Sequence, residues 1–176
     1  MRLGKNQLFF LMWAASFVVA FALPDNPGQS AVLGGIISAI GAIVPAVGNV
    51  KHISAIPEVA SAYFAVMWIL ALIWIPPYFS LTDEQINSYE KATKRKTAFL
   101  FFPALLIAVI WLLFFLPPTE PGRIFKVMLH SRFGLGLIGG ILFSSVPAFI
   151  RGMRMWIHYL PRVLNESNES NIKGGS

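Results

Sequence analysis

Residues 59–79 have the sequence VASAYFAVMWILALIWIPPYF, an apolar stretch without a charged residue or a histidine. A helix needs about 20 mainly apolar residues to cross a hydrocarbon core about 30 Å thick, and this stretch has that length. Pro76 and Pro77 mark its end, because proline does not continue a regular helix. The sequence therefore predicts a transmembrane helix here.

Three further stretches, residues 7–23, 97–116 and 133–150, are equally free of charge and of similar length. Only 12% of the chain is charged and 56% is hydrophobic, whereas soluble domains are about 25% charged. These features predict an all-α integral membrane protein with four transmembrane helices and short interfacial helices. Residues 1–164 form one polytopic membrane domain, and residues 165–176 form a polar, flexible tail.

A fifth apolar segment, residues 31–50, is rich in glycine, alanine and proline and has few large side chains. One interpretation is a re-entrant or interfacial hairpin on the protein surface; the other is a weak fifth span, since glycine and proline are tolerated in membrane helices. Small residues recur here every four positions, which in a helix would form a smooth face for close packing. They are Gly34, Ser38, Ala42 and Ala46.

The distribution of basic residues favours four spans over five. With four spans, ten of the fourteen lysines and arginines lie on the side that holds both termini, whereas five spans divide them six against eight. Cytoplasmic loops carry the excess of lysine and arginine. The sequence therefore predicts that both termini are cytoplasmic, with a bacterial inner membrane as the location.

Several of these basic residues flank the predicted cytoplasmic ends of the spans, where anionic lipid attracts them. We expect such lipid contacts at Lys94, Arg95, Lys96, Arg151, Arg154 and Arg162. For the loop that contains the first three, the alternatives are a solvated connector and a docking helix. A smaller basic stripe, Arg123, Lys126 and His130, predicts a second interfacial helix before the last span, with a partner-binding face as the alternative.

The last span has the clearest packing pattern. Gly136, Gly140, Ser144 and Ala148 recur every four residues and form a stripe of small residues on one helix face. Such a stripe lets two backbones approach closely within lipid. Two uses are open: packing against another helix of the same chain, or binding of a second copy or a partner helix.

The polar side chains away from the span ends are few: Ser16, Ser61, Tyr63, Ser144 and Ser145. Hydroxyls in membrane helices commonly bond to their own backbone or to a neighbouring helix, so we expect these groups to join helices. Charged residues inside the membrane usually mark an ion pathway, and the four predicted spans contain none.

Reactive groups do not converge in the sequence. There is no cysteine, and the three histidines, His52, His130 and His158, fall on two sides of the predicted membrane. A set on the outer side could in principle bind a divalent metal, but its spacing is unspecific: Asp25, His52, Glu58, Glu120 and His130. We therefore expect no catalysis, no metal and no cofactor, and no nucleic-acid partner, because the basic residues flank the spans.

These features favour a non-enzymatic protein that recognises a membrane partner by helix–helix contacts, as an accessory subunit or an immunity or exclusion factor. In length and in its four-span layout with both ends inside, the chain resembles immunity proteins against pore-forming colicins. The expected partners are membrane lipids and a membrane protein or a second copy of the chain. The alternative is a transporter or channel subunit in which the glycine-rich segment re-enters the membrane.

Overall fold

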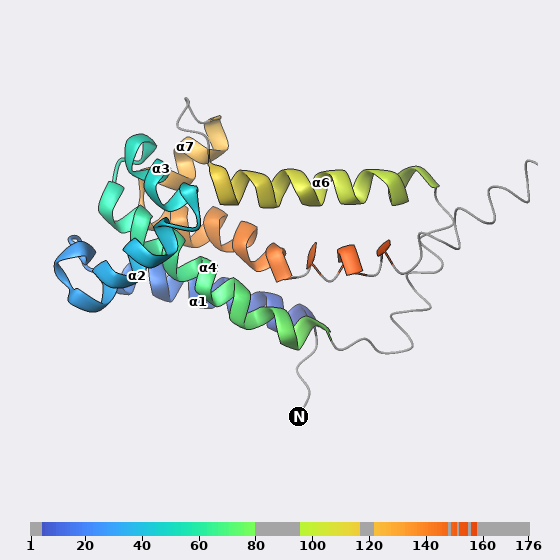
Figure 1. The fold of residues 1–176 in the computed structure, drawn as a ribbon, viewed down its shortest axis with the longest axis horizontal. Helices are drawn as coiled ribbons and strands as arrows, with labels where there is room; N and C mark the ends of the chain where they lie inside the picture. Colours follow the sequence, from blue (N-terminus) through green and yellow to red (C-terminus); the bar gives the residue numbers. More distant parts are fainter. Residues whose placement is uncertain are drawn as a thin grey trace, which may run out of the picture.

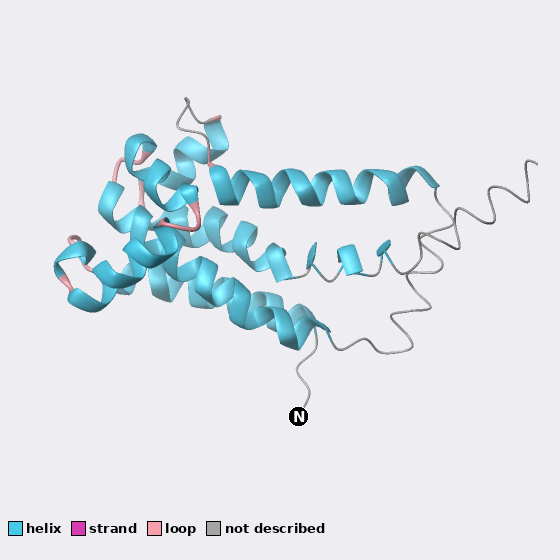
Figure 2. Cartoon of the chain, in the orientation of Figure 1, coloured by secondary structure: helices cyan, strands magenta, loops and turns pink. Residues whose placement is uncertain are grey.

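The computed structural model describes residues 5–79, 96–116, 122–147, 149–150, 152–154 and 156–157. Over these ranges the chain forms helices and connecting turns, and they contain no strand (Figure 2). The predicted all-α class is confirmed.

Four long helices run between the same two ends of the molecule (Figure 1). They are α1 (Lys5–Ala22), α4 (Pro57–Phe79), α6 (Lys96–Phe115) and a C-terminal helix (Arg132–Arg154). The C-terminal helix begins as α8 (Arg132–Gly134) and continues through a π-helical turn, η2 (Leu135–Gly139). Their bounds agree with the predicted spans to within a few residues.

Two of the long helices pass a test of length and composition for crossing a membrane, namely Pro57–Ile75 within α4 and Arg132–Arg154. A bent pair, Ala31–Gly41 with Pro45–Ile53, raises the number to three if it counts as one span. The apolar segments Gln7–Ala22 of α1 and Pro103–Phe115 of α6 are shorter within the described residues. The structure thus supports two or three possible spans, and the number four stays a prediction.

A single four-residue repeat would require residues 31–50 to form one helix, but they form two. These are α2 (Ala31–Gly41) and α3 (Pro45–Ile53), which meet at an angle of 107°. The break has a local cause. Pro45 has no backbone N–H and cannot continue the preceding helix, but it is well tolerated as the first residue of α3. Both helices contact α4, and the hydroxyl of Ser61 in α4 donates to the carbonyl of Val47 in α3 at 2.7 Å.

The core is built on α4. Tyr63, Phe64 and Phe143 are fully buried, and their rings meet edge to face with centroids 5.3 to 6.2 Å apart. Edge-to-face pairs place the positive edge of one ring on the negative face of another. Trp68 extends the cluster toward α6, where its indole N–H donates to the carbonyl of Leu113 at 3.3 Å.

At one end of the long helices, short elements close the bundle (Figure 1). They are the 3-10 turn η1 (Pro27–Gln29), α2, α3 and α7 (Arg123–His130). The helix predicted from Arg123 to His130 is confirmed as α7, with Met128 and Leu129 buried, and its place in a membrane interface stays a prediction. Its end is held by Ser54, whose hydroxyl donates to the carbonyl of Leu129 at 2.8 Å.

Near its C-terminal end, α6 contacts α3 and α4. The side-chain amide of Asn49 in α3 donates to the carbonyl of Phe115 at 2.7 Å, which satisfies one of the free carbonyls of the last turn. Leu116 follows with a φ of 35°, a left-handed conformation that glycine usually occupies at this position. Its side chain is buried.

Candidate functional site

A group of three hydrogen bonds joins α1 and α4 to the π-helical turn η2. The hydroxyl of Tyr63 donates to the carbonyl of Leu135 at 2.8 Å, and the indole N–H of Trp13 donates to that of Leu137 at 3.1 Å. The hydroxyl of Ser16 lies 2.8 Å from the carbonyl oxygen of Gly136 and 2.7 Å from that of Trp13 in its own helix, so these two acceptors share its single proton. We call these residues the π-turn junction. Polar groups in an apolar interior need such partners, because unpaired ones are costly.

The π-helical turn changes the backbone pairing of the Gly136 carbonyl. The N–H of Gly140 bonds to the carbonyl of Leu135, five residues earlier, in place of the usual i−4 pairing. The Gly136 carbonyl therefore lacks its usual bond from Gly140 and lies beside the Ser16 hydroxyl, whereas the carbonyls of Leu135 and Leu137 accept from Tyr63 and Trp13 in addition to the Gly140 N–H. Tyr63 and Ser16 were expected to join helices, and the structure confirms it, whereas the partnership of Trp13 had no signal in the sequence.

The stripe of small residues on the C-terminal helix is an internal packing face. A methyl group built at Gly136 would come within 2.7 Å of the Phe17 ring, and one at Gly140 within 2.7 Å of the Trp13 ring and onto the Ser16 hydroxyl. Gly139, which the four-residue repeat omits, is also closely packed, since the Tyr63 hydroxyl would lie 2.9 Å from such a group. At these positions the stripe packs against another helix of the same chain.

The other two members of that stripe are Ser144 and Ala148. Ser144 is fully buried, and within the described part of the chain its hydroxyl has no hydrogen-bond partner. Ala148 lies outside the described residues. At Gly136 and Gly140 the neighbouring side chains belong to α1, whereas binding of a partner helix to this stripe stays a prediction.

Arg132 fixes the other end of the contact between α1 and the C-terminal helix. Its guanidinium donates to the carbonyl of Ala20 at 2.9 Å and also to that of Leu23, and it pairs with the carboxylate of Asp25 at 2.6 Å. The last carbonyls of a helix have no partner within the helix and carry partial negative charge. Arg132 therefore caps α1 with a positive charge.

The predicted stripe in residues 31–50 is divided between two helices, so its four members do not share one face. Gly34 faces the backbone of Gly28, and a methyl group added at Gly34 would lie 3.0 Å from the Gly28 carbonyl oxygen. Ser38 and Ala42 are exposed, and Ala46 is buried in α3. The physical reason is the 107° bend, which interrupts the four-residue repeat after Gly41.

A different set of small residues lies on the exposed side of α2. Ala31, Gly35 and Ala39 are spaced by four and are all exposed, and a methyl group at Gly35 would meet nothing within 4 Å. Val32, 71% exposed, lies beside them, and α2 contains no charged residue and no buried one. We call Ala31, Gly35 and Ala39 the α2 outer face. The four-residue spacing was recognised in the sequence, but on the neighbouring positions.

The outer set of acids and histidines whose spacing is unspecific for a metal does not assemble among the described residues. Asp25 is paired with Arg132, and Glu58 accepts two bonds from the Lys51 ammonium at 3.0 and 3.1 Å. Over the described ranges, no group of three histidine, aspartate or glutamate residues is close enough to hold a metal ion. Glu120 lies outside those ranges.

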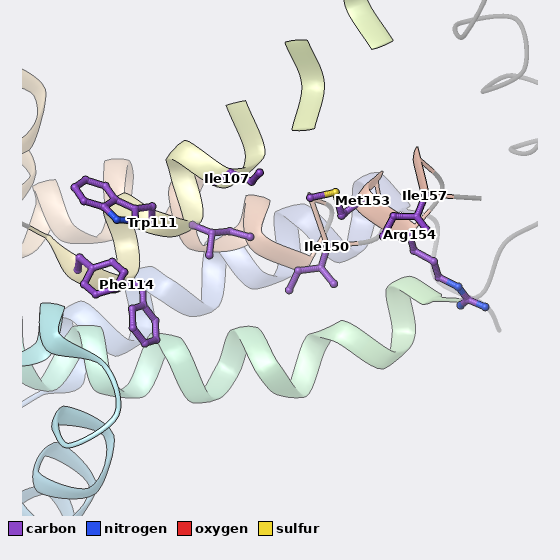
Figure 3. Close-up of a pocket in the computed structure, with 9 residues that line it drawn as sticks. Ile107, Trp111, Phe114, Ile150, Met153, Arg154 and Ile157 are labelled. Carbon is purple, nitrogen blue, oxygen red and sulfur yellow. The ribbon is translucent and has the colours of Figure 1, made fainter. Parts of the chain in front are cut away.

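Of the residues predicted to contact anionic lipid, Arg154 is described in full and Lys96 as the first residue of α6. Lys94, Arg95, Arg151 and Arg162 lie outside the described residues, as do the predicted loop helix and the tail. Arg154 is exposed and lines one end of an apolar groove between α6 and the C-terminal helix (Figure 3).

Comparisons with protein-family models, with curated proteins and with solved structures find no match to this chain. The fold itself defines an all-helical protein with two or three helices that are long and apolar enough to cross a membrane.

Proposed function

We propose that this chain is a non-enzymatic, four-span protein of a bacterial inner membrane that recognises a membrane protein through the α2 outer face. The observation that supports the proposal most directly is the exposure of Ala31, Gly35 and Ala39 on a helix without charge. An apolar helix face of this kind is unfavourable in water and belongs against lipid or protein. Small residues at four-residue spacing suit protein, because a second helix can approach closely.

The length of α2 limits the contact. Its eleven residues extend about 16 Å, roughly half of a hydrocarbon core about 30 Å thick. A partner helix would therefore contact α2 in one leaflet only, the outer one if both termini are cytoplasmic. Roles as an accessory subunit or as an immunity or exclusion factor are compatible with such a contact.

The non-enzymatic part of the proposal has its own support. Two acidic residues lie at the end of the bundle that α2, α3 and α7 cover, and both form ion pairs: Asp25 with Arg132, and Glu58 with Lys51. The hydroxyls of Ser16, Ser61 and Tyr63 bond to backbone carbonyls. Groups with these partners hold the fold together and are poorly placed to react.

Two matched alanine variants test the α2 outer face. Ala39→Leu adds bulk to the face, and Ala108→Leu adds the same bulk to an exposed position on α6. We expect Ala39→Leu to reduce photocrosslinking from a probe at Gly35 by at least tenfold in native membranes, and Ala108→Leu to leave it unchanged, each normalised to inserted protein. A crosslinked product twice the mass of the chain would identify a second copy as the partner. Equal yields from both variants would contradict the proposal.

The second candidate function, a transporter or channel subunit, draws on the bend of 107° between α2 and α3, which is the geometry of a broken span or a re-entrant loop. Because the chain has no cysteine, Ser38→Cys or Ala42→Cys gives a single reporter thiol. A surface-held hairpin predicts alkylation of both thiols by an impermeant reagent. Protection that a permeating solute relieves would favour the conduit.

A further inference from the structure

An apolar groove with a volume of about 650 Å³ lies between α6 and the C-terminal helix. The α6 wall contains Ile107, Ile110, Trp111, Phe114 and Phe115, and the opposite wall contains Ile150, Met153, Arg154 and Ile157. The volume is within the range of about 300–1,000 Å³ that small-molecule sites occupy. The groove is separate from the α2 outer face proposed above.

The ends of the groove differ in chemistry. Figure 3 shows Trp111 and Phe114 at one end, with Arg154 and Ile157 at the other. Arg154 lies at the groove end formed by the last described residues of the C-terminal helix, and its side chain extends away from the apolar lining. That end is also where α6 begins, at Lys96 (Figure 1). An occupant of matching chemistry is apolar along most of its length and anionic at one end.

The dimensions of the groove favour a lipid over a helix. The α6 wall, from Ile107 to Phe115, is about 12 Å long and the wall from Ile150 to Ile157 is about 10 Å long. The combined length of the two walls is shorter than a hydrocarbon core, which is about 30 Å thick. A transmembrane helix is about 10–12 Å wide and crosses the whole core, whereas an acyl chain is narrow and ends inside it.

We propose that this groove binds one acyl chain of an anionic phospholipid whose phosphate is held by the guanidinium of Arg154. Arginine suits this role because its planar donors match phosphate oxygens in pairs. Long basic side chains also place an apolar stem along hydrocarbon and the charge at the headgroup level. With both termini cytoplasmic the lipid belongs to the inner leaflet; this assignment of leaflet rests on the proposed topology, but the binding itself does not.

The first experiment measures lipid binding in detergent, where topology and partner have no influence. The full chain is delipidated and titrated with phosphatidylglycerol or phosphatidylcholine, and bound lipid is counted by native mass spectrometry. We expect phosphatidylglycerol to bind more tightly. Arg154→Gln should weaken its binding about fivefold, the effect of about 1 kcal/mol per basic residue near a lipid surface. Arg123→Gln, at an exposed position on α7, is the charge control and should bind as the wild type does.

A second pair of variants tests the apolar part of the groove. Ile107→Trp places bulk in the groove, and Leu105→Trp places it on an exposed part of α6 that does not line the groove. We expect Ile107→Trp to remove the tightly bound phosphatidylglycerol and Leu105→Trp to retain it. Both positions are more than half exposed, so both variants should fold.

Tryptophan fluorescence locates the acyl chain. Trp111 is half exposed at the groove, so phosphatidylglycerol with brominated acyl chains should quench part of the emission. That part should be lost in Trp111→Phe and reduced in Arg154→Gln.

Three results would overturn the proposal: equal affinity for the two lipids, unchanged binding in Ile107→Trp, or a protein segment crosslinked to a probe at Ile110. Loss of a partner from the α2 outer face with retained lipid binding would leave this inference standing and affect only the proposed function.

Discussion

The hydroxyl oxygen of Ser16 in α1 lies 2.8 Å from the carbonyl oxygen of Gly136 in η2, although 120 positions separate the two residues in the chain. Gly136 makes this approach possible, because a methyl group there would meet the Phe17 ring at 2.7 Å. The glycine and the serine thus act together, one by allowing the two helices to approach and the other by bonding across the contact.

Gly140→Leu should destabilise the fold, because Gly140 packs directly on Trp13 and Ser16. Overpacking of a well-packed interior costs about 1–3 kcal/mol, and contact with the Ser16 hydroxyl places this variant toward the upper end. The measurement is the free energy of unfolding in detergent. Leu137→Ala should have a smaller effect, and Gly35→Leu, on an open surface, should have almost none. Equal stability of Gly140→Leu and Gly35→Leu would contradict the packing described for α1.

Ser16→Ala should lower the free energy of unfolding by about 0.6–2 kcal/mol, the range found for hydrogen bonds between membrane helices. Ser145→Ala is the matched control, since the Ser145 hydroxyl bonds to the Ile141 carbonyl of its own helix at 2.7 Å and joins no second helix. We expect this control to differ from the wild type by only a few tenths of a kcal/mol. If the two variants unfold alike, the bond to Gly136 does not stabilise the junction.

Arg132→Gln should destabilise the molecule by about 1.5–3 kcal/mol, because hydrogen bonds to a charged group are lost from the end of α1. Asp25→Asn should change the free energy of unfolding by less than about 1 kcal/mol, since the Asp25 side chain is 92% exposed while that of Arg132 is 23% exposed. Thermal unfolding of both variants in detergent distinguishes a helix cap from a simple surface ion pair. A larger loss in Asp25→Asn would mean that the ion pair dominates.

A reporter fused after Ser176 should be on the cytoplasmic side. Ten of the fourteen basic residues lie on that side in the four-span layout, and positive charge is retained there during insertion. Green fluorescence without alkaline phosphatase activity is the expected pattern. A phosphatase inserted after Gly28, in the exposed turn before α2, should be active. An active phosphatase at Ser176 would exclude the four-span layout.

The sequence by itself determined the helical class and the approximate bounds of the long helices. Runs without charge set where α4 and the C-terminal helix lie, since hydrophobic length is a local property that needs no knowledge of neighbours. The amphipathic helix α7 was equally accessible, because the spacing of Arg123, Lys126 and His130 is periodic along a single element.

Only the tertiary structure decided which surfaces are used. A stripe of small residues can receive any helix, and the choice of α1 for Gly136 and Gly140 depends on Trp13, Ser16 and Phe17, more than 100 residues away. Likewise, with the bend between α2 and α3, Ala46 lies in the core and the α2 outer face is exposed. Contacts between distant segments depend on how helices are oriented in three dimensions, and a one-dimensional repeat does not contain that orientation.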